Sequence, residues 1–453
     1  MHDLVIRGGQ VVTLAGVISA DIAIEDERIA EIGQDLGAAK EEMDARGLTV
    51  FPGVIDVHVH FNEPGRTHWE GSATGSRAFA AGGGTLFFDM PLNSTPCTVN
   101  GAAFDAKRAA LERSSVTDFA LWGGLVPGNS GELPELAERG VVGFKAFLCD
   151  SGLPEFPRVA EPALLEGMRV AAKFGLPVAV HAESQAITSA LASEAIGNGR
   201  TSVLDYLASR PVRAEVEAIQ FAAAIAEETG AKLHIVHVSS GSGVRAAVEA
   251  RARGVDVSIE TCPHYLFFTA EDMERLGAIA KCAPPLRSVP ERQGLWERVL
   301  DGSVGIIGSD HSPAPLELKS GIDFFQIWGG IAGIQATLAV LLEEGYHRRR
   351  LPLVRVAKLL STRPAQRFNI LNKGAIRAGY EADLAIIRLN EPFVMDAGSL
   401  LQRHATSPYI GCQFRGKVER TLLRGKPAGT RTGRFVRPRV QSIEPDAPPR
   451  SYA

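Results

Sequence analysis

With 453 residues, 45% of them hydrophobic and 22% charged, the chain has the composition of a globular protein and the length for more than one small domain. The net charge of −4 and the absence of a long basic block argue against nucleic-acid binding. No apolar run reaches membrane-spanning length, and five scattered cysteines without a CxxC pair favour a soluble, reduced, cytoplasmic protein.

Residues 1–51 are predicted to form the first part of a small β domain. Short strands are expected at 4–7, 11–14, 21–24 and 28–32, separated by glycine or charged turns. A unit of this size cannot enclose a good core alone, so it needs a partner.

In residues 52–372 short apolar strands alternate with helical segments, a pattern that predicts βα units and a parallel sheet. Eight strands are expected, at 54–60, 85–90, 119–125, 141–147, 177–181, 232–238, 256–261 and 304–310. Helices are expected, for example, at 71–81, 102–112, 163–174, 213–228, 243–253 and 289–300. Eight such units can close into a (β/α)8 TIM-type barrel. An open doubly wound sheet is the alternative, but no glycine-rich phosphate turn follows a strand.

After the last barrel strand, helices are expected near 325–342 and 354–367. Residues 373–453 then become strand-like again, at 383–388, 414–418 and 420–424. A tail rich in Pro, Arg and Ser begins at residue 434 and is expected to be extended. The simplest architecture joins this segment to residues 1–51 in one small β-sandwich beside the barrel.

The stretch FPGVIDVHVH (51–60) carries the first candidate metal ligands. His58 and His60 are two residues apart, so on a strand they share one face, opposite Val57 and Val59. Neutral imidazole is a common ligand of divalent metals. A lone HxH is also common as an exposed pair at a strand end, so the other ligands decide between the two interpretations.

Four more candidate ligands stand at the ends of later predicted strands: Lys145, His181, His237 and Asp310. The active sites of such barrels lie at the carboxyl ends of the strands, so these side chains should meet. Four imidazoles and a carboxylate would be unfavourable to bury together without a metal. His234, three residues before His237, is expected to point the other way.

Lys145 lies between Phe144 and Phe147 on a predicted barrel strand, where an ammonium group is poorly placed. Burial lowers the pKa of lysine, and a neutral amine can react with carbon dioxide to form a carbamate whose two oxygens can bridge two cations. The residues alone leave open a lysine that reaches solvent or pairs with Asp310.

The ordered set of HxH, Lys, His, His and Asp resembles the amidohydrolase superfamily, in particular the cyclic-amide hydrolases: dihydroorotases, hydantoinases or dihydropyrimidinases, and allantoinases. PGVIDVHVH and KGAIRAGYEADLAII (373–387) are similar to its opening and closing signatures, and the likeness covers nearly the whole chain. The resemblance implies two divalent metals, one held by His58, His60 and Asp310, the other by His181 and His237, with Lys145 bridging them as N6-carboxylysine.

The resemblance also implies the cofactors and the chemistry. Zinc is the expected metal, with manganese, cobalt or iron as alternatives, and carbon dioxide is needed to carboxylate the lysine. A hydroxide between the metals would attack a ring amide carbon, with Asp310 as general base and then general acid. The family resemblance further suggests a homotetramer.

Substrate choice is read from the loops. Dihydroorotases typically carry an arginine where this chain has Asn62, which argues against dihydroorotate. The segments 61–71, 90–96, 140–147, 324–335 and 404–411 resemble allantoinases, and so imply hydrolysis of the hydantoin ring of allantoin to allantoate in purine degradation. Candidate substrate contacts are Asn93, Ser312 and Gly330.

Two alternatives stay open. The first is a hydantoinase (dihydropyrimidinase) or dihydroorotase that acts on a related cyclic amide. The second is a non-catalytic assembly protein that has kept the barrel. Such a protein would lack metal ligands, whereas all six positions are filled here.

Overall fold

The computed structural model describes residues 1–429 and 433–439, and its central feature is a closed ring of parallel strands. Six strands run in the order β14-β13-β12-β11-β10-β9 and three in the order β6-β7-β8. The Val142 N–H donates to the Leu121 carbonyl on one side of the join, and a bridge from Val59 to His311 closes the other. The predicted (β/α)8 barrel is confirmed.

All eight predicted strand positions carry a strand, although several are shorter than expected. Their bounds are β6 (Val54–Val59), β7 (Gly84–Asp89), β8 (Asp118–Leu121) continued by β9 (Gly123–Gly124), β10 (Phe144–Phe147), β11 (Val178–His181), β12 (Leu233–Ile235), β13 (Val257–Thr261) and β14 (Ile306–Ile307).

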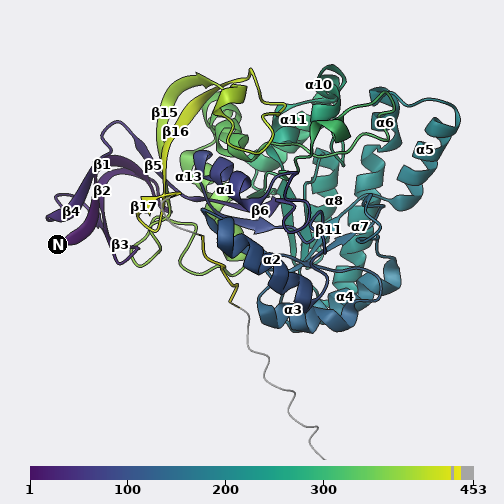
Figure 1. The fold of residues 1–453 in the computed structure, drawn as a ribbon, viewed down its shortest axis with the longest axis horizontal. Helices are drawn as coiled ribbons and strands as arrows, with labels where there is room; N and C mark the ends of the chain where they lie inside the picture. Colours follow the sequence, from purple (N-terminus) through teal and green to yellow (C-terminus); the bar gives the residue numbers. More distant parts are fainter. Residues whose placement is uncertain (430–432, 440–453) are drawn as a thin grey trace, which may run out of the picture.

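Helices cover the outer side of the ring (Figure 1). They are α1 (Ser72–Ala81), α2 (Gly101–Ser114), α3 (Leu133–Arg139), α4 (Glu161–Lys173), α5 (Gln185–Gly197), α6 (Val203–Ser209), α7 (Val212–Thr229), α8 (Gly241–Ala252), α9 (Pro263–Phe267), α10 (Ala270–Leu276) and α11 (Val289–Leu300). The six helices predicted in this region are confirmed. Local chemistry sets their ends: the Asn100 side chain accepts the Ala103 N–H to begin α2, and Gly230, at φ 68°, ends α7. Within the described ranges, no helix has the length and apolarity to cross a membrane.

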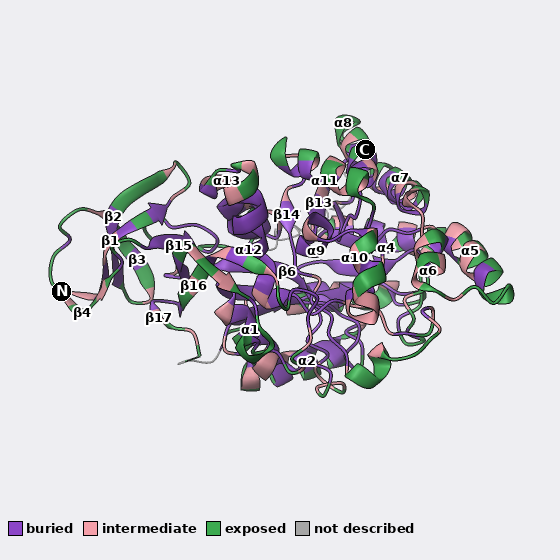
Figure 2. Ribbon diagram, turned by 90° about the horizontal axis from the view of Figure 1, so that it is seen from above, coloured by how far each residue is buried: buried purple, intermediate pink, exposed green. Residues whose placement is uncertain are grey.

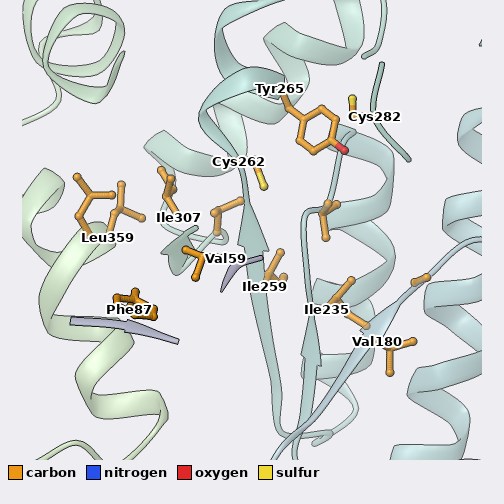
Figure 3. Close-up of a cluster of buried hydrophobic side chains, with 14 of the residues drawn as sticks. Val59, Phe87, Val180, Ile235, Ile259, Cys262, Tyr265, Cys282, Ile307 and Leu359 are labelled. Carbon is orange, nitrogen blue, oxygen red and sulfur yellow. The ribbon is translucent and has the colours of Figure 1, made fainter. Parts of the chain in front are cut away.

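Two apolar clusters hold the barrel together. The larger joins the outer faces of the strands to the helices and includes Val180, Ile235 and Ile259 (Figure 3). The second contains Phe88 and Val236 and occupies the barrel interior. The strands are therefore buried on both faces, whereas exposed residues gather on outer helices such as α5 and α10 (Figure 2).

Strand β6 departs from the predicted alternation. Val57 belongs to the inner cluster and Val59 to the outer one, so the prediction that both point away from His58 on a single face is wrong. The cause is a register shift in the pairing with β7 between Asp56 and Val59. Such an irregularity re-aims the side chains that follow it.

Strands from both ends of the chain form one eight-stranded sheet beside the barrel (Figure 1). The N-terminal strands are β1 (His2–Val12), β2 (Val17–Glu25), β3 (Arg28–Gly33), β4 (Ala39–Asp44) and β5 (Thr49–Pro52), and the C-terminal ones are β15 (Leu384–Val394), β16 (Gln413–Leu423) and β17 (Lys426–Pro427). Antiparallel pairing of β5 with β15 joins the two ends, and the sheet has its own core, which includes Ile6, Ile22 and Leu384. The domain limits at 51/52 and 372/373 stay a prediction. Residues 440–453 of the predicted extended tail lie outside the described residues.

The helix predicted near 325–342 is wrong in its first half. The chain becomes helical only at η4 (Ile334–Ala336), and continues through α12 (Thr337–Val340) and η5 (Leu341–Arg348). The preceding residues are irregular because the buried Lys281 Nζ donates hydrogen bonds to their carbonyl groups, including that of Phe324 at 2.6 Å. The helix predicted at 354–367 is confirmed as α13 (Leu353–Ala357), η6 (Lys358–Thr362) and α14 (Arg363–Arg367). The remaining helical turns are η1 (Ser130–Glu132), η2 (Gly277–Ala280), η3 (Leu316–Lys319) and η7 (Ala397–Ser399).

A buried ion cluster ties the sheet to the barrel. The Nζ atom of Lys373 lies 2.8 Å from an oxygen of Asp118 on β8, 2.6 Å from Asp383 and 2.7 Å from Glu381. Arg424, at the end of β16, also donates to Asp118. Because Lys373, Asp118 and Asp383 are all buried, these charges depend on one another.

Candidate metal centre

A cavity of about 470 Å³ opens at the carboxyl ends of the barrel strands. The structure brings all nine residues singled out in the sequence to its wall: His58, His60, Asn93, Lys145, His181, His237, Asp310, Ser312 and Gly330. These residues are up to 272 positions apart in the chain, so they become neighbours only when the barrel folds.

The carboxylate of Asp310 lies against the first two histidines. Its Oδ1 atom is 3.2 Å from Nε2 of His58 and 3.4 Å from Nε2 of His60. One donor atom each from His58, His237 and Asp310 lie within 4.8 Å of one another. Burial by itself raises the pKa of Asp310, but the neighbouring imidazoles, His58 foremost, lower it more, so the group stays ionised.

His237 and His234 both face the interior, so the expectation that His234 points away is wrong. His234 is fully buried, and its Nε2 atom lies 2.9 Å from Glu260 beneath the cavity. Strand β12 ends at Ile235, and His237 has a φ of +40°. This left-handed conformation ends the alternation and turns the ring into the cavity. Asp310 has a similar φ of +46° and Asn93 one of +69°, so three non-glycine residues at the cavity have left-handed backbone.

Lys145 is buried without a counter-charge in hydrogen-bonding contact. Its side chain is 0% exposed, and its Nζ atom has no hydrogen-bond partner among the described residues. Burial lowers the pKa of Lys145 to about 8, although the charges of Asp310 and Glu260 act in the opposite direction. The solvent-reaching lysine considered from the sequence is excluded, and Asp310 is not within ion-pair distance. An orphaned amine at this depth is costly unless something else occupies the cavity.

Two glutamates that the sequence did not point to, and Asn93, which was expected only as a substrate contact, hold the far sides of the histidine rings. Glu260 Oε1 lies 2.9 Å from Nδ1 of His58, and Glu183 Oε2 lies 2.9 Å from Nε2 of His181. The amide of Asn93 lies 3.3 Å from Nδ1 of His60. In each case the other ring nitrogen is left for the cavity, which is how proteins orient histidines that bind metals. Glu260 lies within β13 and Glu183 just after β11, but only the closed barrel shows which ring each one meets.

Burial also sets the charge state of two of the rings, whereas at His181 burial is outweighed by the neighbouring Cys149 and Glu183, which raise the pKa to about 9. Burial lowers the pKa of His60, and it lowers that of His237 well below the usual value with help from His181 and Lys145. Both imidazoles are therefore neutral near pH 7, which is the form that coordinates a cation. Glu260 keeps its charge: burial raises its pKa, but His58 and His234 lower it further, to about 2.

The opposite wall of the cavity is built by the irregular segment before η4. Gly330 has a φ of +124°, and a β-carbon there would lie 2.2 Å from the Ser312 carbonyl oxygen, so only glycine fits. Its N–H donates to the Lys281 carbonyl and its own carbonyl accepts from Lys319. Arg210 also lines the cavity and forms a 2.5 Å ion pair with Glu183.

The residues present fit a divalent metal centre. Lys145 Nζ and His237 Nδ1 are buried polar atoms without hydrogen-bond partners among the described residues. They face a set of imidazole nitrogens and a carboxylate, a donor set suited to zinc, manganese, cobalt or iron. Without cations, the same groups would leave unpaired polar atoms inside a closed barrel.

Comparisons with known proteins agree with this geometry. The Amidohydrolase family profile matches residues 49–428. The chain is 64% identical over 425 residues to a protein named allantoinase from Solibacter usitatus (strain Ellin6076), covering 94% of this chain and 93% of that protein. It is 54% identical over 450 residues to an allantoinase from Rubrobacter xylanophilus, covering 98% and 99%.

A solved structure of a similar protein has the same fold. The L-hydantoinase (dihydropyrimidinase) of Arthrobacter aurescens superposes with a TM-score of 0.93 at 34% identity, covering 96% of this chain and 100% of the other. With the family profile spanning the barrel and part of the sheet, and with relatives this similar over nearly their whole length, the chain belongs to the amidohydrolase family.

Proposed function

We propose that the protein is an allantoinase, which hydrolyses the hydantoin ring of allantoin to give allantoate in purine degradation. The observation that supports this chemistry is the convergence on one cavity of six side chains that could bind metals, among them an unpartnered buried lysine. The observation that favours allantoin is the high identity to proteins of that name. A hydantoinase or dihydropyrimidinase is the second candidate, because solved relatives of that kind share the fold.

The metal centre is proposed to hold two divalent ions, as enzymes of this family generally do. His58, His60 and Asp310 would bind one ion, and His181 and His237 the other. Lys145 would bridge them after its neutral amine has added to carbon dioxide and lost a proton, giving N6-carboxylysine. The low pKa of Lys145 supports this step, because it raises the fraction of neutral amine near pH 7.

When bound, the two ions would lower the pKa of a water molecule and polarise the ring carbonyl group. The protein's own residues do the rest. Asp310, already held close to His58 and His60, takes the proton of the attacking water and passes it to the leaving ring nitrogen. Its depressed pKa keeps it ready as a base before the reaction.

Substrate contacts are assigned to three residues on the cavity wall. Ser312 offers a hydroxyl group beside the site. Gly330 has already donated its N–H to Lys281, so it would meet the ring through its carbonyl oxygen, which has a second lone pair. Asn93 is shared with His60, so it would orient that ligand as well as contact the substrate.

We further propose a cytoplasmic homotetramer. The location is supported by five cysteines that are all unpaired, as in a reducing compartment. The assembly is supported by the resemblance to hydantoinases, which are typically oligomeric.

Glu260→Gln tests the support given to the metal ligands. Glutamine cannot keep a charged contact with both His58 and His234, so the His58 ring should lose its fixed tautomer. We expect zinc affinity to fall by about 10–100-fold, measured by competition with a chelator. Glu249→Gln, an exposed substitution on α8, is the matched control and should leave the affinity unchanged. Equal affinities in the two variants would remove Glu260 from the metal centre.

The substrate proposal is tested by turnover of metal-loaded protein on allantoin, hydantoin, dihydrouracil and dihydroorotate, with bicarbonate present. We expect the highest kcat/KM on allantoin and little or no turnover of dihydroorotate. A preference for hydantoin or dihydrouracil would favour the second candidate while leaving the metal centre in place.

A further inference from the structure

A second hollow, of about 370 Å³, lies at the opposite end of the barrel from the metal centre. It is lined by Val257 at the start of β13 and by Gly305 just before β14, so it faces the amino ends of these strands. Three arginines, Arg251, Arg363 and Arg367, complete its wall. We call it the arginine hollow.

Positive charge in the arginine hollow is not balanced by the protein. Arg251 comes from α8, whereas Arg363 and Arg367 come from α14. Among the described residues, the one carboxylate in an ion pair with this group is Asp256, which contacts Arg367. A fourth guanidinium, that of Arg355, stands beside Gly302 on the hollow's rim. Four cations therefore share one counter-charge in a protein whose net charge is −4.

The arginines bind backbone groups, but these bonds leave many donors free. Arg363 donates to the Val304 carbonyl at 3.3 Å through one of its five N–H groups, and no other hydrogen bond from it is recorded among the described residues. Arg251 donates to the Val257 carbonyl at 3.1 Å and 2.9 Å and to the Ser303 carbonyl at 3.4 Å, which leaves two of its five N–H groups without a protein partner among the described residues. The Nε atom of Arg367 is buried without a hydrogen-bond partner among the described residues.

The positive charges of these arginines lower the pKa values of their neighbours. Burial lowers the pKa of Arg251, and the charges of Arg367 and Arg363 lower it further. Burial and the charge of Arg355 likewise lower the pKa of Arg363. An anion placed among them would relieve this repulsion.

We propose that the arginine hollow binds a small oxyanion that carries two or more negative charges, of the size and chemistry of phosphate. Guanidinium groups suit such a ligand, because their planar N–H pairs match two oxygens at once and they remain charged. The competing interpretation is that the arginines only cap backbone carbonyls at the base of the barrel. That role explains the bonds to Val257, Ser303 and Val304, but it does not explain the missing counter-charges.

The test measures thermal unfolding of the full-length, metal-loaded protein while inorganic phosphate replaces chloride at constant ionic strength. A ligand that binds the folded state raises the midpoint in proportion to its occupancy. We expect such a rise in the wild type. Arg363→Gln and Arg251→Gln should each need about tenfold more phosphate for the same rise. Turnover of both variants should stay at the wild-type level, because the hollow lies at the other end of the strands.

Arg253→Gln is the matched control, because it removes the same charge from an exposed pair with Glu227 just beyond α8. Its response to phosphate should equal that of the wild type. A phosphate response that is unchanged in the Arg363 and Arg251 variants would place the anion elsewhere, for example at the metal centre, and would overturn the proposal. If phosphate does not raise the unfolding midpoint of the wild type, the proposal is also overturned. The same holds if both variants lose the same stability with and without phosphate, since the arginines would then only cap backbone carbonyls.

Discussion

Lys145→Ala is expected to lose both tight metal binding and catalysis, with kcat/KM falling by about 10³-fold or more. The residue is the one proposed ligand that belongs to both metals, so its loss removes the bridge and leaves two clusters of imidazoles without a shared anion. The surroundings of Lys145 offer no substitute partner for its side chain. Its Nζ atom is fully buried and unpartnered among the described residues, with the Phe147 ring 4.9 Å away.

Metal content by mass spectrometry and turnover of allantoin should be measured on the same samples. Lys173→Ala, an exposed substitution at the end of α4, is the control and should keep both properties. Short carboxylic acids added to the Lys145 variant should restore part of each, because they supply the two oxygens that the carbamate provided. A Lys145 variant with full metal content and normal turnover would remove this residue from the centre.

Lys373→Met is expected to produce the largest loss of stability, about 3–5 kcal/mol of unfolding free energy. The substitution roughly keeps the volume but leaves Asp118 and Asp383 buried without the ammonium that now lies 2.8 Å and 2.6 Å from them. Because Asp118 belongs to barrel strand β8 and Asp383 adjoins β15, the loss should loosen the join between the barrel and the eight-stranded sheet.

Denaturant unfolding of the metal-loaded protein measures this effect. Lys426→Met provides the comparison: this lysine pairs at 3.1 Å with Glu41 on the surface, where such pairs contribute about 0–1 kcal/mol. Similar losses in the two variants would show that the buried cluster does not hold the two parts together.

The sequence was most informative where one local pattern governs the structure. Strands buried on both faces and helices with clear ends, such as α11, were predicted closely. Local periodicity failed where backbone conformation changed without a sequence signal. His237 turns inward because of a positive φ, and the segment before η4 stays irregular because the distant Lys281 binds its carbonyls. Neither cause can be read from neighbouring residues.

The same distinction between local and long-range causes applies to the metal centre. Its candidate ligands could be found because barrel chemistry gathers at strand ends, which a sequence pattern locates. The residues that support them could not, because Glu260 meets His58 across 202 positions of the chain. The arginine hollow was missed for the same reason: Arg251 and Arg363 become neighbours only after α8 and α14 pack at the base of the barrel.

The proposed reaction requires a catalytic centre that holds two metals, and this can be measured directly. Metal-free protein is titrated with zinc in the presence of bicarbonate, and bound zinc and allantoin turnover are followed together. We predict that turnover reaches its maximum at two bound zinc ions per chain. Full turnover with one ion or with none would contradict the two-metal centre, and two bound ions without turnover of allantoin would contradict the proposed substrate.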